Sequence, residues 1–566
     1  MKRSKLIVFY LVLISFPVIL KAQQNSYGTV TIASPTAAAL GKYADIPVSY
    51  HTGIPQINIP LYTVKAGSLE LPIGLSYHAS GLKVMETASW VGAGWSLNAG
   101  GVITRTVMGL PDEKNTGSGA VDIYGYYTDS GYNKYLYQNG ADQDWLGFSA
   151  GRKDGEPDLF FFNFGGYSGK FFFRDDHTPI LVPQQDIRIV PYFPNPGTTS
   201  IQGFTIITPD GNQYLFGNTP NVTTTPPIEI TNPYSIQYGY SSGTAISSWY
   251  LNKVISYDGV FSINLTYTPE SYGYYTLSNN PMDPFSASNN VIELGLTKNI
   301  ISGVKLSQIT FPNGKIDFIP GQVRTDLSDD QHTPTDNTNT SATSLGAINI
   351  SNNDSSFCKK YIFSYGYFMD NVTATPTMLN DYSVTLLTDR SRLRLDSVKE
   401  QTCDNLLQIP ARRFTYFGEM VPRRLTLALD HWGFFNGVTS NQTLIPTYTE
   451  TTNGTVSNTI TGANRDANWP AMRGGSLNKM TYPTGGYSIF DFEPADSYNK
   501  SITTPQLQNI PNTNVSVHMQ GQGTIFSQTF TFFFQRSGND YDGAKLYTRL
   551  SRHCNYKRFD WLHRIF

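Results

Sequence analysis

The stretch "LPIGLSYHASGLKVMETASWVGAGWSL", from Leu71 to Leu97, holds two tryptophans, one tyrosine and four glycines but only two side chains charged at neutral pH when histidine is counted as neutral. Together with the "NAGGVITR" that follows, it predicts strands joined by turns, with Leu75–Tyr77 and Trp95–Leu97 as sheet segments. A segment this apolar and this rich in glycine is typical of packed sheet rather than of a catalytic loop.

The glycines and aromatic residues of this stretch have separate expected roles. Gly92 and Gly94 let the backbone turn tightly, because glycine adopts positive φ without steric cost. Tyr77, Trp90 and Trp95 supply a large apolar surface to one face of the sheet. We therefore expect a structural role for the stretch and no catalytic one.

The whole chain of 566 residues has the composition of a sheet protein. Its 36 tyrosines and 33 phenylalanines suit a pleated surface, while 49 glycines and 33 prolines interrupt the sequence too often for long helices. We predict an all-β fold, with repeated antiparallel hairpins forming a large multi-sheet, shell- or sandwich-like structure with long polar loops. The formal charge of −2 gives no indication of a nucleic-acid partner.

Residues 1–22 have the pattern of a Sec signal peptide. A basic start precedes an apolar run over residues 6–20, and the segment ends at Ala22. Pro17 and Lys21 leave the run short for a membrane span, which disfavours an uncleaved anchor. The sequence therefore predicts a secreted or cell-surface protein, cleaved near Ala22, with no transmembrane helix in the mature chain.

Four phrases share one pattern: an apolar strand, a turn built on Pro-x-Gly or Asp-Gly, and a second alternating strand. Proline presets the first turn residue and glycine takes the positive φ that closes a hairpin. The four predicted hairpins are "FTIITPDGNQYLFG" (204–217), "LNKVISYDGVFSINLTY" (251–267), "SQITFPNGKIDFIP" (307–320) and "LNKMTYPTGGYSIFDFE" (477–493).

The opening stretch resembles the amino-terminal signature of SpvB-type virulence proteins and toxin-complex cocoon subunits. In that family a Leu-Ser-Tyr-x-Ser-Gly phrase precedes Gly-x-Gly-Trp-Ser-Leu and a strand ending in Arg. The matching residues are Leu75, Ser76, Tyr77, Ser80, Gly81, Gly92, Gly94, Trp95, Ser96, Leu97 and Arg105. His78 and Ala79 stand where the family has one residue, and the spacer "LKVMETASWV" is longer than the family's.

Later phrases resemble the front halves of secreted Rhs/YD-repeat proteins, and the likeness covers about residues 31–493. They are "EPDLFFFNFGGYSGKFFF" (156–173), "DHWGFFNG" (430–437) and "MTYPTGGYSIFDFE" (480–493). The resemblance implies a structural shell around a carboxy-terminal toxin, and it carries over no catalytic residue. The chain has no run of Tyr-Asp repeats and no Rhs core.

The patterns divide the chain into seven parts. We expect 1–22 as signal peptide, 23–114 as an SpvB-like β region, 115–325 as hairpin repeats, 326–356 as a polar loop, 357–493 as a second β region, 494–540 as a final β segment and 541–566 as a basic tail. The tail carries six Lys and Arg against two Asp. A partner-binding element, an assembly end and out-of-frame translation are alternatives for it, and we favour truncation.

The residues that we single out belong to the structural motifs of these phrases. They are Leu75, Ser76, Tyr77, Gly92, Gly94, Trp95, Asp430, Trp432, Gly433, Pro483, Gly485 and Gly486. In "DHWGFFNG" the Asp430–His431 pair is interpreted as a turn anchor, with Trp432 and Phe434 expected in the core.

No motif predicts catalysis, a metal site or a cofactor. "GFSAG" (147–151) matches a hydrolase nucleophile elbow by letter, but Gly155 and Pro157 prevent the helix that this elbow needs. The eight histidines lack zinc-ligand spacing. Cys358 and Cys403 each precede a strand-like phrase, so a disulfide bridge is possible, but we favour two buried free thiols.

Two functions from different classes follow. The first is an exported structural β-shell portion of an Rhs/YD-repeat-type polymorphic toxin or cell-surface protein, without enzymatic activity, whose partner would be a downstream Rhs core or toxin segment. The second is a secreted β-module that binds a surface glycan or a host surface.

The signal-peptide prediction can be tested at the amino terminus. Mass spectrometry of the protein recovered from the extracellular fraction should find a first residue near Gln23, because signal peptidase cuts after a small residue such as Ala22. An intact Met1 on the extracellular protein would contradict the prediction.

Overall fold

The computed structural model describes residues 46–49, 52–114, 125–126, 154–174, 176–194, 200–220, 225–236, 240–241, 244–279, 294–332, 335–354, 357–370, 387–452, 455–460, 462–494, 513–521, 524–534 and 546–547. The predicted signal peptide and nearly all of the basic tail lie outside these residues. The chain separates into two compact units, residues 1–492 and 493–566. Each unit is described by itself.

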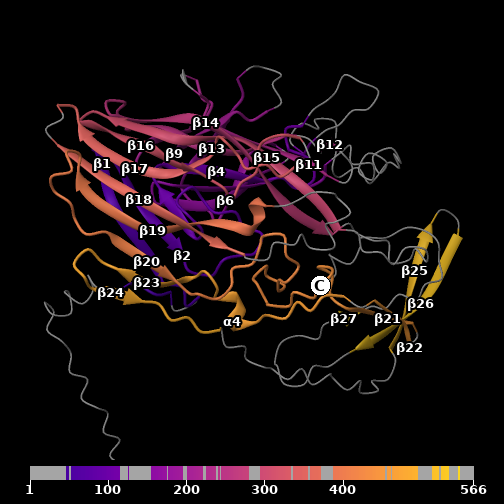
Figure 1. The fold of residues 1–566 in the computed structure, drawn as a ribbon. Helices are drawn as coiled ribbons and strands as arrows, with labels where there is room; N and C mark the ends of the chain where they lie inside the picture. The colour runs from indigo at the N-terminus through magenta and orange to yellow at the C-terminus, as the bar shows by residue number, and fades with distance from the viewer. Residues whose placement is uncertain are drawn as a thin grey trace, which may run out of the picture. The chain divides into compact units, whose positions relative to one another are not determined.

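The first unit is built almost entirely from strands (Figure 1), which confirms the all-β prediction. Its strands are β1 (Gln56–Ala66), β2 (Leu69–His78), β3 (Trp95–Asn98), β4 (Gly101–Thr106), β5 (Leu159–Phe164), β6 (Tyr167–Phe173), β7 (Pro179–Val182), β8 (Arg188–Tyr192), β9 (Gly203–Ile207), β10 (Gln213–Gly217), β11 (Ile228–Ser235), β12 (Tyr240–Ser241), β13 (Ala245–Ile255), β14 (Ser262–Asn279), β15 (Leu294–Phe311), β16 (Gly314–Val323), β17 (Thr343–Asn352), β18 (Cys358–Met369), β19 (Ser391–Thr402), β20 (Arg412–Tyr416), β21 (Tyr448–Thr452), β22 (Thr455–Ile460), β23 (Leu477–Thr481) and β24 (Tyr487–Ile489). Two short helices are η2 (Thr388–Arg390) and α4 (Trp469–Met472).

Antiparallel pairing between successive strands builds most of the first unit. The pairing runs from β13 through β14, β15, β16, β17, β18, β19 and β20, and continues through β23 to β24. Two further runs, β8–β9–β10 and β4–β5–β6–β7, join β13 through β10 and β4. Strand β11 pairs with both β13 and β15, so β13, β14, β15 and β11 form a ring of paired strands.

All four predicted hairpins are present. They are the pairs β9–β10, β13–β14, β15–β16 and β23–β24. In three of the turns the glycine takes the expected positive φ, at Gly211, Gly259 and Gly485, whereas Gly314 of the β15–β16 turn does not and begins β16. Local turn chemistry therefore decided these pairings.

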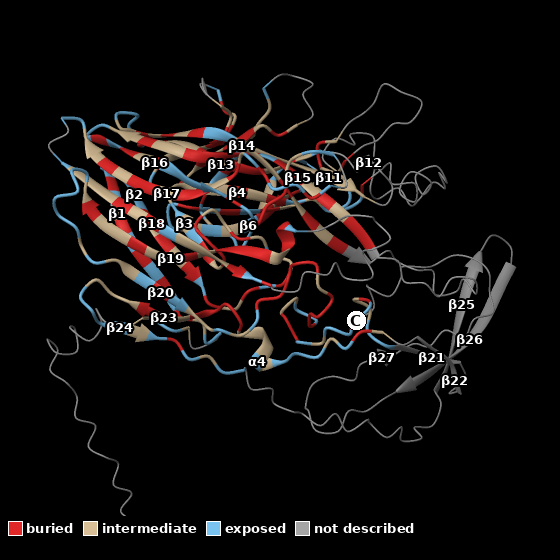
Figure 2. Cartoon of the chain, in the orientation of Figure 1, coloured by how far each residue is buried: buried red, intermediate tan, exposed pale blue. Residues whose placement is uncertain are grey.

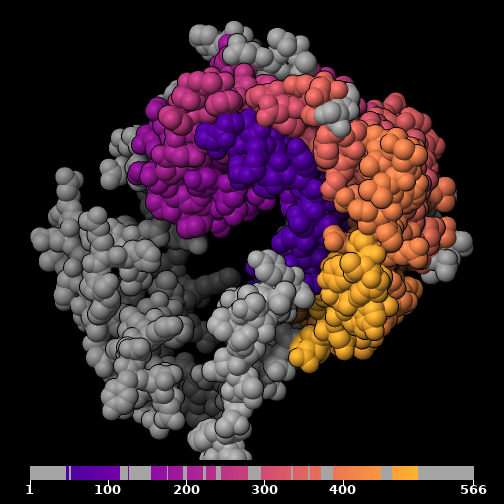
Figure 3. Space-filling view, turned by 90° about the vertical axis from the view of Figure 1, so that its left-hand side faces the viewer, coloured from indigo at the N-terminus to yellow at the C-terminus, as the bar shows by residue number. Residues whose placement is uncertain are grey.

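Strands β1, β2 and β3 form a separate sheet with one buried face. In β2 every second side chain is buried, and in β1 the same alternation holds on either side of a bulge near Leu61, as the red bands along both strands in Figure 2 show. This face shares one hydrophobic core with the main sheet. The Tyr361 hydroxyl of β18 donates to the Leu61 carbonyl of β1 at 2.8 Å. Figure 3 shows the indigo amino-terminal segment on the inner side of the magenta and orange parts of this unit.

A second part of the core is a cluster of phenylalanines from the phrase at 156–173. Phe160 stacks on Phe171 with ring centroids 4.9 Å apart, and both rings contact Phe204 of β9. Phe204 in turn packs edge-on against Trp249 of β13 at 5.1 Å. Aromatic side chains thus join the β4–β7 strands to the β8–β10 strands, as expected for residues with large apolar surfaces.

The prediction of a polar loop over 326–356 is wrong for its second half. Strand β17 occupies Thr343–Asn352, and its Leu345, Ile348 and Ile350 are buried. The run of Asp, Asn and Thr before it dominated the composition of the segment, while the short apolar pattern of "SLGAINI" was enough to form a central strand.

The expectation of free thiols at Cys358 and Cys403 is also wrong, because the two form a disulfide with Cα atoms 5.5 Å apart. Strands β18 and β19 pair with Lys359 opposite Thr402. This register places Cys358 opposite Cys403 and so within disulfide distance.

The second unit contains the final β segment that the sequence predicts. Its strands are β25 (Thr513–Gly521), β26 (Thr524–Phe534) and β27 (Leu546–Tyr547). Strands β25 and β26 form an antiparallel hairpin, and β26 also pairs with β27.

Trp95 connects the amino-terminal sheet to strands that follow it by more than 300 residues. Its indole Nε1 donates to the Tyr416 hydroxyl at 2.9 Å, and this hydroxyl donates to the Leu395 carbonyl at 2.6 Å. Its ring lies 4.5 Å from that of Phe414 between centroids. The side chain is 1% exposed. Trp95 is therefore a core residue with its one polar atom satisfied.

Replacing Trp95 with alanine should lower the free energy of unfolding by about 3–5 kcal/mol, because a large buried side chain is lost and a cavity remains. Urea unfolding followed by circular dichroism measures this change. Trp432→Ala is the matched control, since Trp432 is 67% exposed, and it should change the free energy by at most about 0.5 kcal/mol. Equal losses in the two variants would contradict the assignment of Trp95 to the core.

Candidate functional site

The structure brings the first group of motif residues together. Leu75, Ser76 and Tyr77 on β2 face Leu97, Ser96 and Trp95 on β3 in direct register. The Tyr77 hydroxyl accepts a hydrogen bond from the Leu477 backbone N–H of β23 at 2.9 Å. Leu75, Tyr77 and Trp95 are thus part of the packed core, as predicted, whereas Ser96 is exposed.

Gly92 and Gly94 form the turn before β3, and both have positive φ, at 107° and 74°. A Cβ atom on Gly92 would lie 2.8 Å from the Leu395 backbone nitrogen, and one on Gly94 would lie 2.6 Å from the Tyr77 ring. Both glycines are therefore required by conformation and by close approach to neighbouring atoms.

The second group of motif residues forms a turn against the spacer of the first. The Asp430 carboxylate accepts the backbone N–H groups of Trp432 at 2.8 Å and Phe434 at 2.9 Å. The Val84 N–H donates to the Gly433 carbonyl at 2.8 Å. The prediction of Asp430 as a turn anchor agrees with this geometry.

The expectation that Trp432 lies in the core is wrong, since 67% of this side chain is exposed. Phe435 is the buried aromatic residue of the phrase, and Phe434 is half-buried. The two hydrogen bonds to Asp430 hold the backbone so that Trp432 points outward. Pro483, Gly485 and Gly486 belong to the separate turn between β23 and β24, in which the Gly485 N–H donates to the Tyr482 carbonyl at 3.0 Å.

A cavity that the sequence did not predict lies beside the ring of strands. It has a volume of about 660 Å³, and we call it the Glu229 chamber. One wall comes from the opening stretch and its continuation, including Trp90 and residues 96–102. The other wall comes from β11, β13, β14 and β15. Its charged and phenolic lining groups are Glu229, Tyr250, Tyr267, Glu270, Tyr272, Lys305 and Arg324.

Glu229 is bound by hydroxyl groups. Its Oε1 accepts from the hydroxyls of Ser247 at 3.0 Å and Ser248 at 3.2 Å, and its Oε2 accepts from the Tyr250 hydroxyl at 3.3 Å. Burial raises the pKa of Glu229, while these hydroxyl donors act in the opposite direction and the charge of Glu270 adds to the rise. The carboxyl group can accept hydrogen bonds, and donates one when protonated.

Glu270 faces the same chamber from β14, which is separated from the β11 strand of Glu229 by β15. Glu270 on β14 pairs with Gly303 on β15, and Ser302 beside it pairs with Ile230 on β11. Glu229 therefore lies on the opposite side of Gly303 from Glu270. A Cβ atom added to Gly303 would lie 3.4 Å from the Cγ of Glu229. Because directly opposed residues of paired strands share a face, both glutamates point to one side of the sheet.

The other charged groups of the chamber are paired. Lys305 Nζ lies 3.1 Å from Glu270 Oε2 and donates to the Thr343 hydroxyl at 2.8 Å. Arg324 forms two hydrogen bonds to Asp326, at 3.0 and 2.8 Å. The chamber thus combines neutralised ion pairs, one carboxyl group held by hydroxyls, and aromatic side chains.

Sequence reasoning missed the chamber because its polar groups come from four strands that only the folded register brings together. One signal was available: Lys305 interrupts the apolar pattern of "ISGVKLSQITF", and a lysine in a buried strand requires a partner. Its partner on β14 could not be chosen without the register of the pairing.

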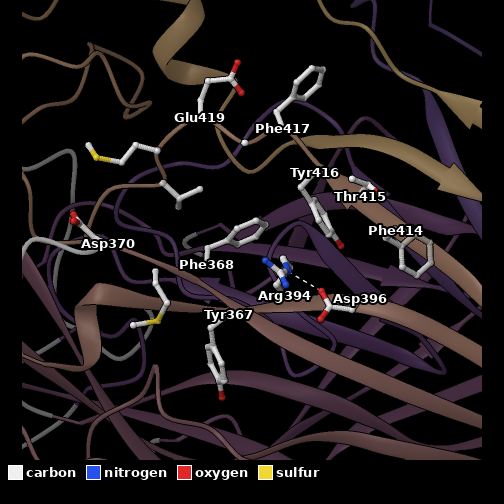
Figure 4. A pocket seen from close by; sticks show the side chains of 14 residues that line it. Tyr367, Phe368, Asp370, Arg394, Asp396, Phe414, Thr415, Tyr416, Phe417 and Glu419 are labelled. Carbon is white, nitrogen blue, oxygen red and sulfur yellow. Dashed lines mark hydrogen bonds and ion pairs between the residues drawn. The ribbon is translucent and has the colours of Figure 1, made fainter.

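A second hollow is a cleft of about 760 Å³ lined by β18, β19, β20 and the segment after β20 (Figure 4). Arg394 and Asp396 form an ion pair at 2.6 Å, drawn dashed in the figure, and the guanidinium group lies over the Phe368 ring at 5.5 Å. Tyr416, which packs edge-on against Phe368 at 5.2 Å, is the partner of Trp95. The cleft is thus adjacent to the structural core, and its charges are paired.

A buried ion cluster surrounds Arg105, the last residue of the opening motif. Arg105 Nη1 lies 2.5 Å from Glu113 Oε2 and 3.4 Å from Asp158 Oδ2. Its guanidinium carbon lies over the Trp249 ring at 5.3 Å. The Asp158 backbone N–H donates to the Asp112 carboxylate at 2.8 Å, and the Asp112 backbone N–H donates to the Asp158 carboxylate at 3.0 Å. The cluster therefore fixes the start of β5 beside β4.

Within the described ranges, no three His, Cys, Asp or Glu side chains gather in a way that could hold a metal ion. No helix in the part of the chain that the structure describes is long and apolar enough to cross a membrane. Comparison of the chain with protein-family models and with curated proteins finds no match.

Asp112→Asn should flatten the dependence of stability on pH. Burial and the nearby charge of Asp158 raise the pKa of Asp112 to about 8, against about 3.9 for an unfolded chain. The folded state therefore retains a proton that the unfolded state releases, and stability from this group is full below about pH 4 and is lost as pH rises through about 8.

Urea unfolding at several pH values between about 5 and 9 tests this. Asp258→Asn is the control. A hydrogen bond from Ser256 lowers the pKa of this exposed carboxyl, so its titration changes stability only at pH values below the tested range. A variant at Asp112 that keeps the wild-type slope would contradict the assignment.

Proposed function

We propose that the chain is an exported structural β-scaffold, a shell portion of an Rhs/YD-repeat-type polymorphic toxin or cell-surface protein, without a catalytic site of its own. The run of successively paired strands supports a scaffold, because each added hairpin extends the same sheet. The motif residues taken from the resemblance support it too, since they pack in the core or form turns.

The observation that carries the proposal is the edge of β24. This strand pairs with β23 along Lys479–Thr481, and among the described residues no pairing register includes its other edge. Tyr487 is 58% exposed and Ile489 61% exposed. An edge strand with exposed apolar side chains is a template for pairing with another strand. A further Rhs core or toxin segment is the partner that we propose for this edge.

A second candidate is a secreted module that binds a glycan or a host surface. Trp432 favours it, because the exposed indole lies on a turn that Asp430 holds by two hydrogen bonds. The Arg465 Nε also donates to the Asp430 carbonyl at 3.0 Å. A rigid exposed aromatic side chain binds a surface at little cost in conformational entropy.

The scaffold proposal predicts that positive charges on the β24 edge abolish the association of this chain with the proposed Rhs core or toxin segment. The tagged protein is purified from producing cells as wild type, as the double variant Tyr487→Lys/Ile489→Lys and as the control Tyr257→Lys/Val260→Lys. The control changes a tyrosine and an aliphatic residue in the β13–β14 turn, which are 68% and 70% exposed. Wild type and control should copurify with a protein that carries Tyr-Asp repeats or a toxin segment, identified by mass spectrometry.

The edge variant should lose that protein, because lysine on an edge strand opposes pairing. The proposal fails if the wild-type chain recovers no such protein, or if the edge variant recovers as much of it as the control.

A further inference from the structure

We infer that the Glu229 chamber is a binding site for a short neutral oligosaccharide. The inference goes beyond the scaffold function and does not depend on it, since the chamber lies on β11, β13, β14 and β15 and not on the β24 edge.

The size and opening of the chamber suit a small ligand. Its volume of about 660 Å³ lies within the range of roughly 300–1,000 Å³ that is usual for ligand sites. Ser96, Asn98 and Asn163 are exposed lining residues and mark the mouth. Arg324, which also lines the chamber, is buried. A ligand would thus pass from polar amide and hydroxyl groups at the mouth to aromatic side chains inside.

The pairing of charges selects a neutral ligand. Lys305 is bound to Glu270 and Arg324 to Asp326, so neither cation is free for a phosphate or carboxylate group. Glu229 has hydroxyl donors as its partners. An anionic ligand would meet two glutamates, and a cationic one would have to displace hydrogen bonds that already hold Glu229. Both cost more than the placement of a neutral ligand.

The remaining groups match the two kinds of surface on a sugar ring. Trp90, Tyr250, Tyr267 and Tyr272 offer aromatic surface for its C–H face. Carboxyl, amide and hydroxyl groups among the lining residues offer donors and acceptors for its hydroxyls. A purely apolar ligand would leave the Tyr272 hydroxyl without water or a partner.

Tyr272 supplies the group that most directly points to a ligand. The hydrogen bonds between described residues include none with its phenol, although Tyr250 and Tyr267 donate to Glu229 and to the Leu251 carbonyl. The Tyr272 side chain is partly accessible and lines the chamber. Burial raises the pKa of this phenol well above its usual range, so it remains a hydrogen-bond donor.

The experiment is a calorimetric titration of the mature full-length chain with maltotriose, cellotriose and triacetylchitotriose. At least one trisaccharide should bind with one site per chain. Tyr272→Phe keeps the ring and removes only the hydroxyl, and Glu229→Gln keeps the shape and removes the charge. Each should weaken binding about tenfold, the usual effect of one lost hydrogen bond in a buried site.

Trp432→Ala is measured alongside to test the exposed turn of the second candidate function, and Tyr257→Ala is the control, because it removes an exposed aromatic residue of the β13–β14 turn that does not line the chamber. Its affinity should stay within about twofold of wild type. Thermal unfolding of each variant shows whether it is folded. The inference is overturned if no trisaccharide binds the folded wild type, if both chamber variants bind like wild type, or if only Trp432→Ala loses binding. The last result would assign the sugar to the exposed turn instead, and none of these results bears on the β24 test.

Discussion

The hydrogen bond from the Trp95 indole to the Tyr416 hydroxyl is the interaction on which the arrangement of the first unit depends. Tyr416 passes the bond on to the Leu395 carbonyl, and nearby the Leu477 N–H donates to Tyr77. Three strands of the main sheet are thus fixed to β2 and β3 by polar contacts inside an apolar core. An unsatisfied partner there would cost about 1–3 kcal/mol, so these bonds select one packing of the two layers over any other.

Features of the fold that depend on neighbouring residues could be predicted from the sequence. The four hairpins follow from proline, aspartate and glycine at fixed turn positions, and the role of Gly92 follows from its need for positive φ. Features that depend on pairing over long distances could not. Cys403 lies opposite Cys358 only because β18 and β19 pair in one register across 45 residues, and the segment between them carries no signal for that register.

The Glu229 chamber illustrates the same limit for a site. Its glutamates are 41 residues apart in sequence and become neighbours through Gly303, which pairs with Glu270 and leaves room for the Glu229 side chain. No spacing rule relates such residues, in contrast to metal or nucleotide motifs whose ligands lie on one turn. Trp432 shows a different limit. Its hydrophobic character alone led to the prediction that it is buried, but the hydrogen bonds of Asp430 hold the turn so that this side chain is exposed.

The separation of 400 residues between Tyr77 and its partner Leu477 has a consequence for how the chain reaches this structure. Synthesis at about 5–20 residues per second places roughly 20–80 s between the two residues. During that time the apolar face of β1 and β2 lacks its contact with β23, while the strands made earlier supply other parts of the same core. Topologies dominated by such distant contacts fold slowly. The contact between Tyr77 and β23 therefore forms only after nearly all of the first unit has been synthesised, and completion of this core waits for the end of that unit.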